Sequence, residues 1–203
     1  MESFMPSPGL RERKKQKTRD TIIRVALDLF AEKGYEHTTI AEIAEAAEIS
    51  PRTIFAYFPS KEDIVFYDLP VVHEVLAQAL RDRPEGATTL DVLREIIVCS
   101  LAPDPTHQQR RCIISSDETL QRSKRARFAP LEELMVGAIA QDLGAGPGDI
   151  RPQVVAAALV AAFTAVSDPT TEPPEPYTEA QALAVIDDVL RFLRGGLEAL
   201  RNG

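Results

Sequence analysis

The chain contains little of several residue types on which other protein classes depend. It has no Trp, 6% aromatic residues and two Cys among 203 residues. Cys99 and Cys112 are too few, and too far apart, for a zinc site or a disulfide framework. The composition therefore favours a fold held by helix packing, and it predicts no metal site and no cofactor.

Long hydrophobic runs are missing as well. The longest, from Val154 to Val166, has about 13 residues, whereas ~20 are needed to span a bilayer. Residues 1–20 also lack the apolar core of a signal peptide. We therefore expect a cytoplasmic protein without a membrane partner.

The sequence lacks complete catalytic motifs. His73 and Glu74 begin a metalloprotease-like motif, but Ala77 stands where the second His is required. The glycine-rich segment 144–148 follows a predicted helix, whereas a phosphate-binding loop follows a strand. No Gly-x-Ser-x-Gly motif occurs. An enzyme is therefore not expected.

The charge is unevenly distributed. The net charge is −8, yet residues 1–24 hold seven Lys or Arg, among them Lys14 and Lys17, against three acidic residues. A basic arm on an acidic body suits a protein that touches phosphate at one end. A solvated basic tail is the alternative that charge alone leaves open.

Hydrophobic spacing predicts an all-α fold. Apolar residues recur at i, i+3, i+4 and i+7, and no segment alternates with period two. We expect about nine helices: near 14–33, from 39, from 50 to 58, from 60 with a kink or break at Pro70, and near 90–101, 107–119, 121–142, 150–167 and 178–201. The expected domains are a disordered lead-in (1–10), a helix-turn-helix domain (11–65) and a larger helical domain (66–203).

Two short helices carry the clearest functional pattern. Thr39 and Glu42 form a capping box, and Ser50 followed by Pro51 is a helix start. In the second helix Ile54 and Phe58, spaced i and i+4, should face inward. Arg52 and Phe55 then face outward, where an arginine fork can bind guanine in the major groove.

The segments Thr38–Ala44 and Ile49–Glu62, the latter reading ISPRTIFAYFPSKE, resemble the DNA-binding signature of the TetR family of transcriptional regulators. The resemblance implies operator DNA as a partner. It also implies contacts by the residues at matching positions, with Arg52 and Phe55 on the bases and Thr39, Thr53, Tyr57 and Lys61 on the DNA backbone. Together with the basic arm, the predicted DNA-binding residues are Lys14, Lys17, Thr39, Pro51, Arg52, Thr53, Phe55, Tyr57 and Lys61.

One residue departs from the family pattern. Glu48 occupies the turn between the two short helices, where the family usually has Gly. If Glu48 adopts a left-handed conformation there, strain of roughly 1 kcal/mol is expected.

The resemblance further implies a homodimer built from the last two helices. The sequence agrees, because the segment from Val154 to Val166 is apolar around much of its circumference and must be buried. That both helices simply close the core of one chain is the alternative. The predicted interface residues are Val155, Leu159, Ala162, Val166, Leu183, Ile186, Leu190 and Leu193.

A small hydrophobic effector is the remaining partner that the resemblance implies, bound by helices between about residues 70 and 143. Residues that could line its pocket, or equally belong to a plain core, are Leu93, Ile97, Leu101, Leu134, Met135, Ile139 and Phe163. The basic cluster of Arg122, Lys124, Arg125 and Arg127 could hold the phosphates of an acyl-CoA-like effector, or could be a solvated face. The expected function is a repressor that leaves a near-palindromic operator on effector binding; the alternative is an effector-independent regulator or an activator.

Overall fold

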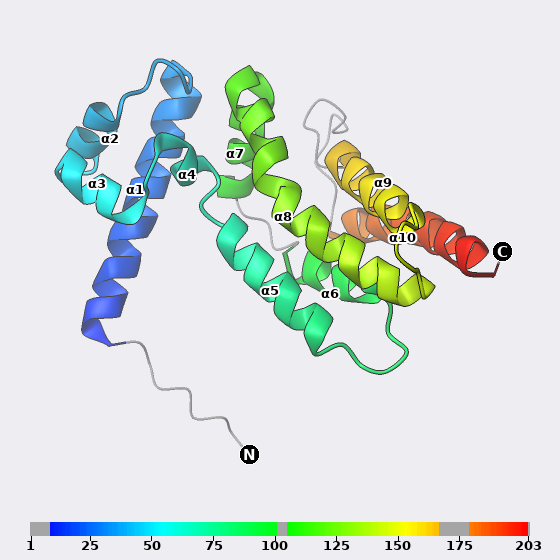
Figure 1. Cartoon of the computed structure of the whole chain (residues 1–203). Helices are drawn as coiled ribbons and strands as arrows, with labels where there is room; N and C mark the ends of the chain where they lie inside the picture. The colour runs from blue at the N-terminus through cyan, green and yellow to red at the C-terminus, as the bar shows by residue number, and fades with distance from the viewer. Residues whose placement is uncertain (1–8, 101–104, 167–178, 203) are drawn as a thin grey trace. The chain divides into compact units, whose positions relative to one another are not determined.

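The computed structural model describes residues 9–100, 105–166 and 179–202, which form ten helices and no strand (Figure 1). The all-α prediction is confirmed. One helix more than predicted is present, because the helix that starts after Ser60 ends at Val65 and a new one begins at Leu69. Pro70 lies in the first turn of this new helix, where its missing N–H leaves no hydrogen bond unmade. No described helix is long and apolar enough to cross a membrane.

The chain divides into two compact units that are not continuous in sequence. The first consists of residues 1–67 and 105–120, and the second of residues 68–104 and 121–203. The helix at 105–116 therefore packs with the N-terminal helices, whereas the sequence prediction placed it in the domain 66–203. Of the predicted disordered lead-in (1–10), residues 1–8 lie outside the described residues, while Gly9 is the N-cap and Leu10 the first residue of the first helix.

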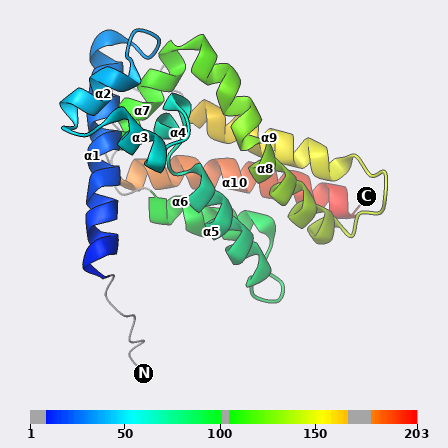
Figure 2. The ribbon, with the colours of Figure 1, turned by 60° about the vertical axis from the view of Figure 1, so that its left-hand side comes forward.

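The first unit is built around α1 (Leu10–Lys33), onto which α2 (Ile40–Ala46), α4 (Lys61–Val65) and α7 (Pro105–Ser116) pack, while α3 (Pro51–Tyr57) packs against α2 (Figure 2). Gly34, with a φ of 86°, ends α1 in the way the sequence predicted. The core of this unit is formed by side chains from all five helices and the loops between them: Ile22, Ile23, Ala26, Leu27, Phe30, Tyr35, Ile43, Ile54, Phe58, Ile64 and Ile113.

The second unit contains α5 (Leu69–Arg81), α6 (Thr89–Ser100), the part of α8 (Glu118–Leu143) from Gln121 onward, α9 (Arg151–Val166) and α10 (Glu179–Asn202). α10 packs against both α6 and α9, and α6 against α5. One hydrophobic cluster joins these helices, with Leu90, Ile139, Ala156 and Leu159 fully buried at its centre.

Five residues of the predicted dimer interface lie in the hydrophobic core of the chain itself. Their side chains are at most 8% exposed: Val155, Leu159, Ile186, Leu190 and Leu193. Ala162 and Leu183 are half-buried, and the side chain of Val166 lies outside the described residues. A helix that is apolar all round carries two apolar faces, and its periodicity does not say which of them turns toward its own core.

The residues predicted to line an effector pocket are mostly core residues. Leu93, Met135 and Ile139 are buried in the hydrophobic cluster, and Ile97 packs against it. Leu101 and the side chain of Phe163 lie outside the described residues. Only Leu134 of this set lines the groove described below.

Candidate nucleic-acid interface

The start of α2 is fixed by the predicted capping box. The Thr39 hydroxyl accepts from the backbone N–H of Glu42 (3.2 Å), and the Glu42 carboxylate accepts from the backbone N–H of Thr39 (2.8 Å) and from its hydroxyl (2.9 Å). Lys33, in the last turn of α1, also donates to Glu42 (2.9 Å). Local chemistry thus sets where α2 begins and ties it to the end of α1.

The turn between α2 and α3 needs a left-handed residue. Glu48 has a φ of 54°, as its place in the turn predicted, and it is the one non-glycine residue with positive φ in the described part of the chain. The chain then reverses so that the Ile49 N–H donates to the Ala44 carbonyl at 2.9 Å. This conformation strains a residue with a β-carbon, and the burial of the two helices offsets that strain.

α3 begins at Pro51 with Ser50 as its N-cap. The Ser50 hydroxyl oxygen accepts from the backbone N–H of Thr53 at 3.1 Å, and its distance to the Thr53 hydroxyl oxygen is 2.8 Å. The Thr53 hydroxyl is therefore held at the first turn of α3, at the surface of the unit. The prediction of this helix start is confirmed.

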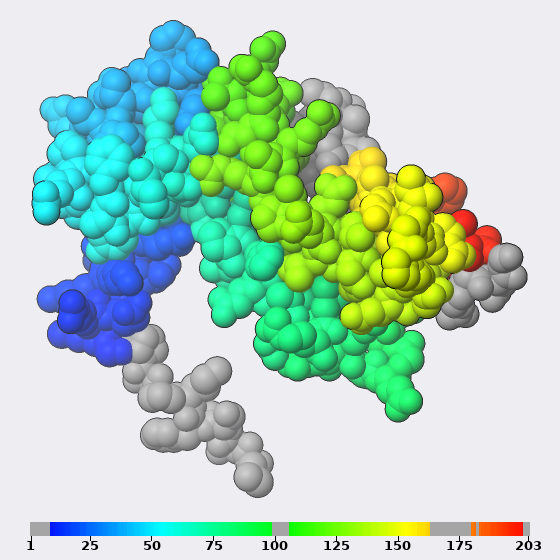
Figure 3. Space-filling model, in the orientation of Figure 1, coloured from blue at the N-terminus to red at the C-terminus, as the bar shows by residue number. Residues whose placement is uncertain are grey.

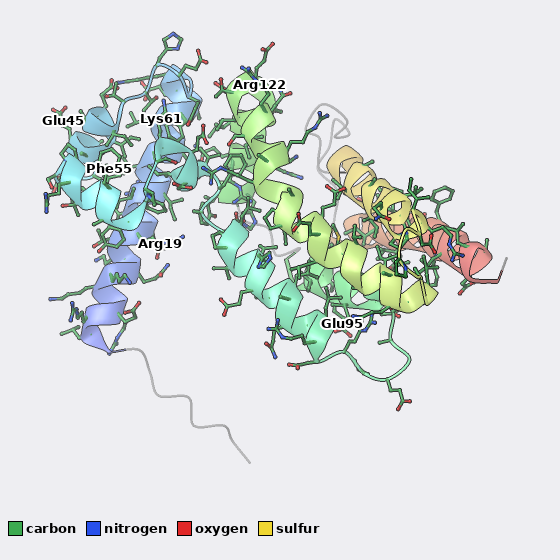
Figure 4. All side chains as sticks on the ribbon, in the orientation of Figure 1. Arg19, Glu45, Phe55, Lys61, Glu95 and Arg122 are labelled. Carbon is green, nitrogen blue, oxygen red and sulfur yellow. The ribbon has the colours of Figure 1, made fainter. Side chains whose placement is uncertain are left out.

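α3 has one buried face and one exposed face. Ile54 is fully buried and Phe58, its C-cap, is 2% exposed, so both face the core. Pro51 and Arg52 are exposed, and Phe55 is 52% exposed on the outer side of the helix (Figure 4). The half-exposed ring lies next to an exposed arginine, on a helix whose other face is buried. Such an exposed aromatic side chain is typical of a surface that contacts a partner.

The other predicted DNA-binding residues surround this surface in different degrees of exposure. Lys14 and Lys17 are exposed on the N-terminal half of α1, and Thr39 is exposed at the start of α2. Thr53, Tyr57 and Lys61 are half-buried. The structure therefore keeps at least part of every one of these side chains accessible.

Lys61 has an internal role that its sequence position did not reveal. Its ammonium group donates to the carbonyls of Tyr35 (2.7 Å) and Thr38 (3.0 Å) and lies 4.1 Å from the centre of the Tyr35 ring. Burial lowers the pKa of Lys61. The side chain thus holds the loop that leads into α2, directly before Thr39 (Figure 4).

Arg19 is a structural residue that the sequence analysis missed. Its guanidinium lies 5.2 Å from the centre of the Phe58 ring and 5.8 Å from that of Tyr67, and it donates to the Tyr67 carbonyl at 2.7 Å. A signal was present, because Arg19 shares the helical phase of the buried Ile22, Ile23 and Phe30. A charged residue in that phase indicates a partner inside the fold.

The second unit carries a groove between α5 and α8. Its volume is about 840 Å³, and residues of the loop between α5 and α6 also line it. On α8 the lining residues follow one helical face, and on α5 Ala77 and Leu80 form apolar floor. Arg83 fixes the loop to α8 through an ion pair with Asp142 (2.7 Å), whose other oxygen accepts from the Thr89 N–H (2.7 Å). In Figure 3, α5 and the C-terminal half of α8 lie side by side on this face of the unit.

Comparison with known proteins agrees with this arrangement. Residues 22–67, which hold α2, α3 and α4, match the family of bacterial regulatory proteins called the tetR family. Residues 89–198, more than half of the chain, match the MftR C-terminal domain. The chain belongs to the TetR family. It is a DNA-binding transcriptional regulator, and its relatives are regulators rather than enzymes, in agreement with the sequence prediction.

Three relatives show how far the similarity extends. The transcriptional regulator MftR of Mycobacterium tuberculosis is 30% identical over 157 residues, which cover 75% of this chain and 79% of MftR. TcmR of Streptomyces glaucescens is 48% identical over 86 residues, but these cover only 42% of this chain and 38% of TcmR. The fold matches that of FadR from Bacillus subtilis in complex with stearoyl-CoA, with a TM-score of 0.61, 20% identity, and coverage of 86% of this chain and 96% of FadR.

The capping box should be visible as an unusually acidic carboxyl group. The hydrogen bond from Lys33, followed by those from the Thr39 backbone and hydroxyl, lowers the pKa of Glu42 from 4.5 to about 2. Because the folded state favours the charged form, the stabilisation by Glu42 is complete above pH 4.5 and is lost as the pH falls toward 2. A carbon-13 NMR titration of the Glu42 carboxyl should give a midpoint near 2, and the Lys33→Met variant should move it upward. A wild-type midpoint near 4.5 would contradict the hydrogen bonding described.

Proposed function

We propose that the chain is a homodimeric repressor that reads a near-palindromic operator through α3 and leaves it when a small hydrophobic effector binds the second unit. The proposal that α3 reads DNA rests on its two opposite faces. Ile54 and Phe58 are buried on one face, and Arg52 and Phe55 are exposed on the other. In a helix-turn-helix protein the second helix enters the major groove. Arg52 then forks onto guanine, and Phe55 contacts a thymine methyl group.

Contacts to phosphate fix the register of α3 in the groove. Lys14 and Lys17 supply positive charge from α1, and Thr39, Thr53 and Tyr57 supply polar groups. The N–H and the hydroxyl of Thr39 both donate to the Glu42 carboxylate. A phosphate bound at Thr39 must therefore share these donors with the carboxylate or displace it. Two of the three N–H groups of Lys61 donate to carbonyls within the chain, so only the third can donate to a phosphate.

The base-reading role is tested by two substitutions of Arg52. Arg52→Ala should weaken binding to the operator by about 1–3 kcal/mol and relax base preference, because the arginine fork is lost. Arg52→Lys should keep the affinity for random duplex DNA but lose base preference, since Lys offers a point charge in place of a fork. Genomic footprinting of the purified protein supplies the operator, and fluorescence anisotropy at two salt concentrations measures both affinities.

The matched control is Arg125→Ala, which removes an exposed arginine from α8 in the second unit. Its affinity for the operator should equal that of the wild type. Unchanged operator binding by Arg52→Ala would refute the assignment of α3 as the reading helix.

The homodimer proposal rests on the outer faces of α9 and α10. On α9 the exposed residues Val154, Ala157, Ala158 and Ala161 follow one stripe. On α10 the stripe consists of Phe192, which is 80% exposed, with Gly195, Gly196 and Ala199. Small residues allow helices to approach closely, and a large exposed ring beside them fits a hollow on a second copy. Since α9 and α10 pack side by side, the two stripes can form one surface.

A dimer of this kind places two copies of α3 on the DNA. If the operator is near-palindromic, the two reading helices lie ~34–36 Å apart, one turn of the duplex. This geometry is the reason for proposing a two-fold operator rather than a single half-site.

Phe192→Glu should separate the dimer. The side chain is 80% exposed within the chain, so the substitution leaves the core of each copy intact but places a charge at the interface. Light scattering after size exclusion should give twice 22.3 kDa for the wild type and 22.3 kDa for the variant. The control is Val75→Ser on α5, which also removes an exposed apolar side chain (48% exposed). This variant should have the same mass as the wild type. A Phe192→Glu variant that stays dimeric, or a monomeric wild type, contradicts this interface.

The groove between α5 and α8 is the proposed effector site. Its volume of about 840 Å³ is within the range of sites that hold drug-sized ligands. On α8 the lining residues Pro130, Leu134, Gly137 and Gln141 continue the helical phase of Arg127, so they form with this basic residue one stripe along the helix. From Arg127 to Gln141 the stripe is roughly 21 Å long. An effector with an apolar chain and a phosphate end, such as an acyl-CoA, fits this pattern.

Effector binding would act by population shift, favouring a conformation in which the two reading helices no longer fit successive grooves. The break between α4 and α5 at residues 66–68 is the proposed joint for that change, because α4 ends there with Phe66 as its C-cap and α5 begins with Asp68 as its N-cap.

Gly137 offers a way to fill the groove without disturbing the core. A β-carbon at Gly137 would meet no atom within 4 Å. Gly137→Phe should therefore weaken stearoyl-CoA binding at least tenfold in calorimetry and leave operator affinity unchanged, while Gly137→Ala should behave as the wild type. If the wild type binds no stearoyl-CoA at micromolar concentration, acyl-CoA is not the effector class; if Gly137→Phe binds it normally, the groove is not the site.

A further inference from the structure

Tyr67 is followed in the sequence by the first residue of the second unit. It is the last residue of the first unit's N-terminal part, between Phe66, the buried C-cap of α4, and Asp68, the N-cap of α5. Its ring is contacted from two helices, by Arg19 of α1 at 5.8 Å and by Arg110 of α7 at 5.1 Å, measured from each guanidinium carbon to the ring centre. Three segments that are distant in sequence therefore meet at this one side chain.

Arg19 connects Tyr67 to the reading helix. The same guanidinium that donates to the Tyr67 carbonyl at 2.7 Å lies 5.2 Å from the centre of the Phe58 ring. Phe58 is the C-cap of α3 and one of the two side chains that anchor α3 to the core. No carboxylate in the described part of the chain pairs with Arg19, so its charge is stabilised by one carbonyl and two ring faces. Its position consequently depends on where Tyr67 stands.

Arg110 connects Tyr67 to α7. This helix is held on α1 by the buried Ile113 and by a hydrogen bond from Gln109 to Asp28 (3.1 Å). The chain passes between the two units at 67/68, 104/105 and 120/121. Tyr67 is at the first of these passages, and Arg110 lies on the helix that begins at the second. The Arg110–Tyr67 contact thus joins the residue before the first passage to the helix that follows the second.

From these contacts we infer that Tyr67 is a positioning residue through which α7 and the start of α5 act on the reading helix. A shift of α7 moves Arg110 on the Tyr67 ring; since a cation–π contact depends on the placement of the cation over the ring face, the ring follows. Arg19, bound to both the ring and the carbonyl of Tyr67, carries the displacement to Phe58 and so to the orientation of α3. The inference rests on the proposed function and deepens it, because it names contacts inside the first unit that set the orientation of α3.

The inference is tested by hydrogen exchange on the full chain without DNA. Arg110→Met removes the cation from one side of Tyr67 while keeping an apolar stem. Exchange of the Phe58 N–H, which donates to the Ile54 carbonyl at 2.9 Å, should then become at least fivefold faster. Gln109→Ala is the matched control: it breaks another contact of α7 with α1 next to Arg110 without touching Tyr67, and it should leave that rate unchanged. Amides of α9 in the second unit report global unfolding and should be unaffected in both variants.

A second pair of variants decides the question if Arg110→Met unfolds the chain. Tyr67→Phe keeps the ring and the carbonyl and should match the wild type, whereas Tyr67→Leu keeps the carbonyl but loses the ring and should speed exchange at Phe58. Equal rates at Phe58 for Arg110→Met and Gln109→Ala, or for Tyr67→Leu and Tyr67→Phe, would overturn the inference.

The DNA-binding assay separates this inference from the proposed function. On the footprinted operator, Arg110→Met should bind about tenfold more weakly than Gln109→Ala. If the wild type binds no operator, the repressor proposal fails, and the exchange comparison still decides whether Tyr67 positions α3. If the wild type binds and the two α7 variants bind equally, the positioning role fails while the repressor proposal stands.

Discussion

The rotation of α3 about its own axis is fixed by two buried side chains, and what the protein can offer to DNA depends on that rotation. Ile54 and Phe58 lie one helical turn apart and fill the core of the first unit. Turning α3 by half a revolution would expose both, at a cost of roughly 3–6 kcal/mol. Burying the half-exposed Phe55 would recover only part of that free energy, and the same rotation would also bury Arg52. The outward position of Arg52 and Phe55 is thus a consequence of packing behind them.

Features that depend on neighbouring residues could be predicted from the sequence. The capping box of Thr39 and Glu42, the N-cap at Ser50 and the left-handed Glu48 all arise from interactions within a few residues, and the structure has all of them. The two faces of α3 follow from the spacing of Ile54 and Phe58. The motif that shows the family is therefore also the part of the fold that local chemistry determines most completely.

Features that depend on contacts between distant segments could not be predicted. The pairing of Arg83 with Asp142 joins residues 59 apart, and nothing local marks either as a partner. The orientation of α9 was ambiguous for a different reason, since Val155 and Leu159 point inward while Val154 and Ala158 point outward, and all four are apolar. Lys61 shows a third case. Its position matched a phosphate contact in the family, but its ammonium also binds two carbonyls, an arrangement that only the packed loop reveals.

The grouping of α7 with the N-terminal helices changes what counts as the DNA-reading part of this chain. A fragment ending near residue 65 would keep the helix-turn-helix but lose Ile113 from its core and the contacts of Arg110 and Gln109. The unit that holds α3 is therefore interrupted by residues 68–104, which belong to the other unit. Because the chain passes between the units at three points, three stretches of backbone connect them.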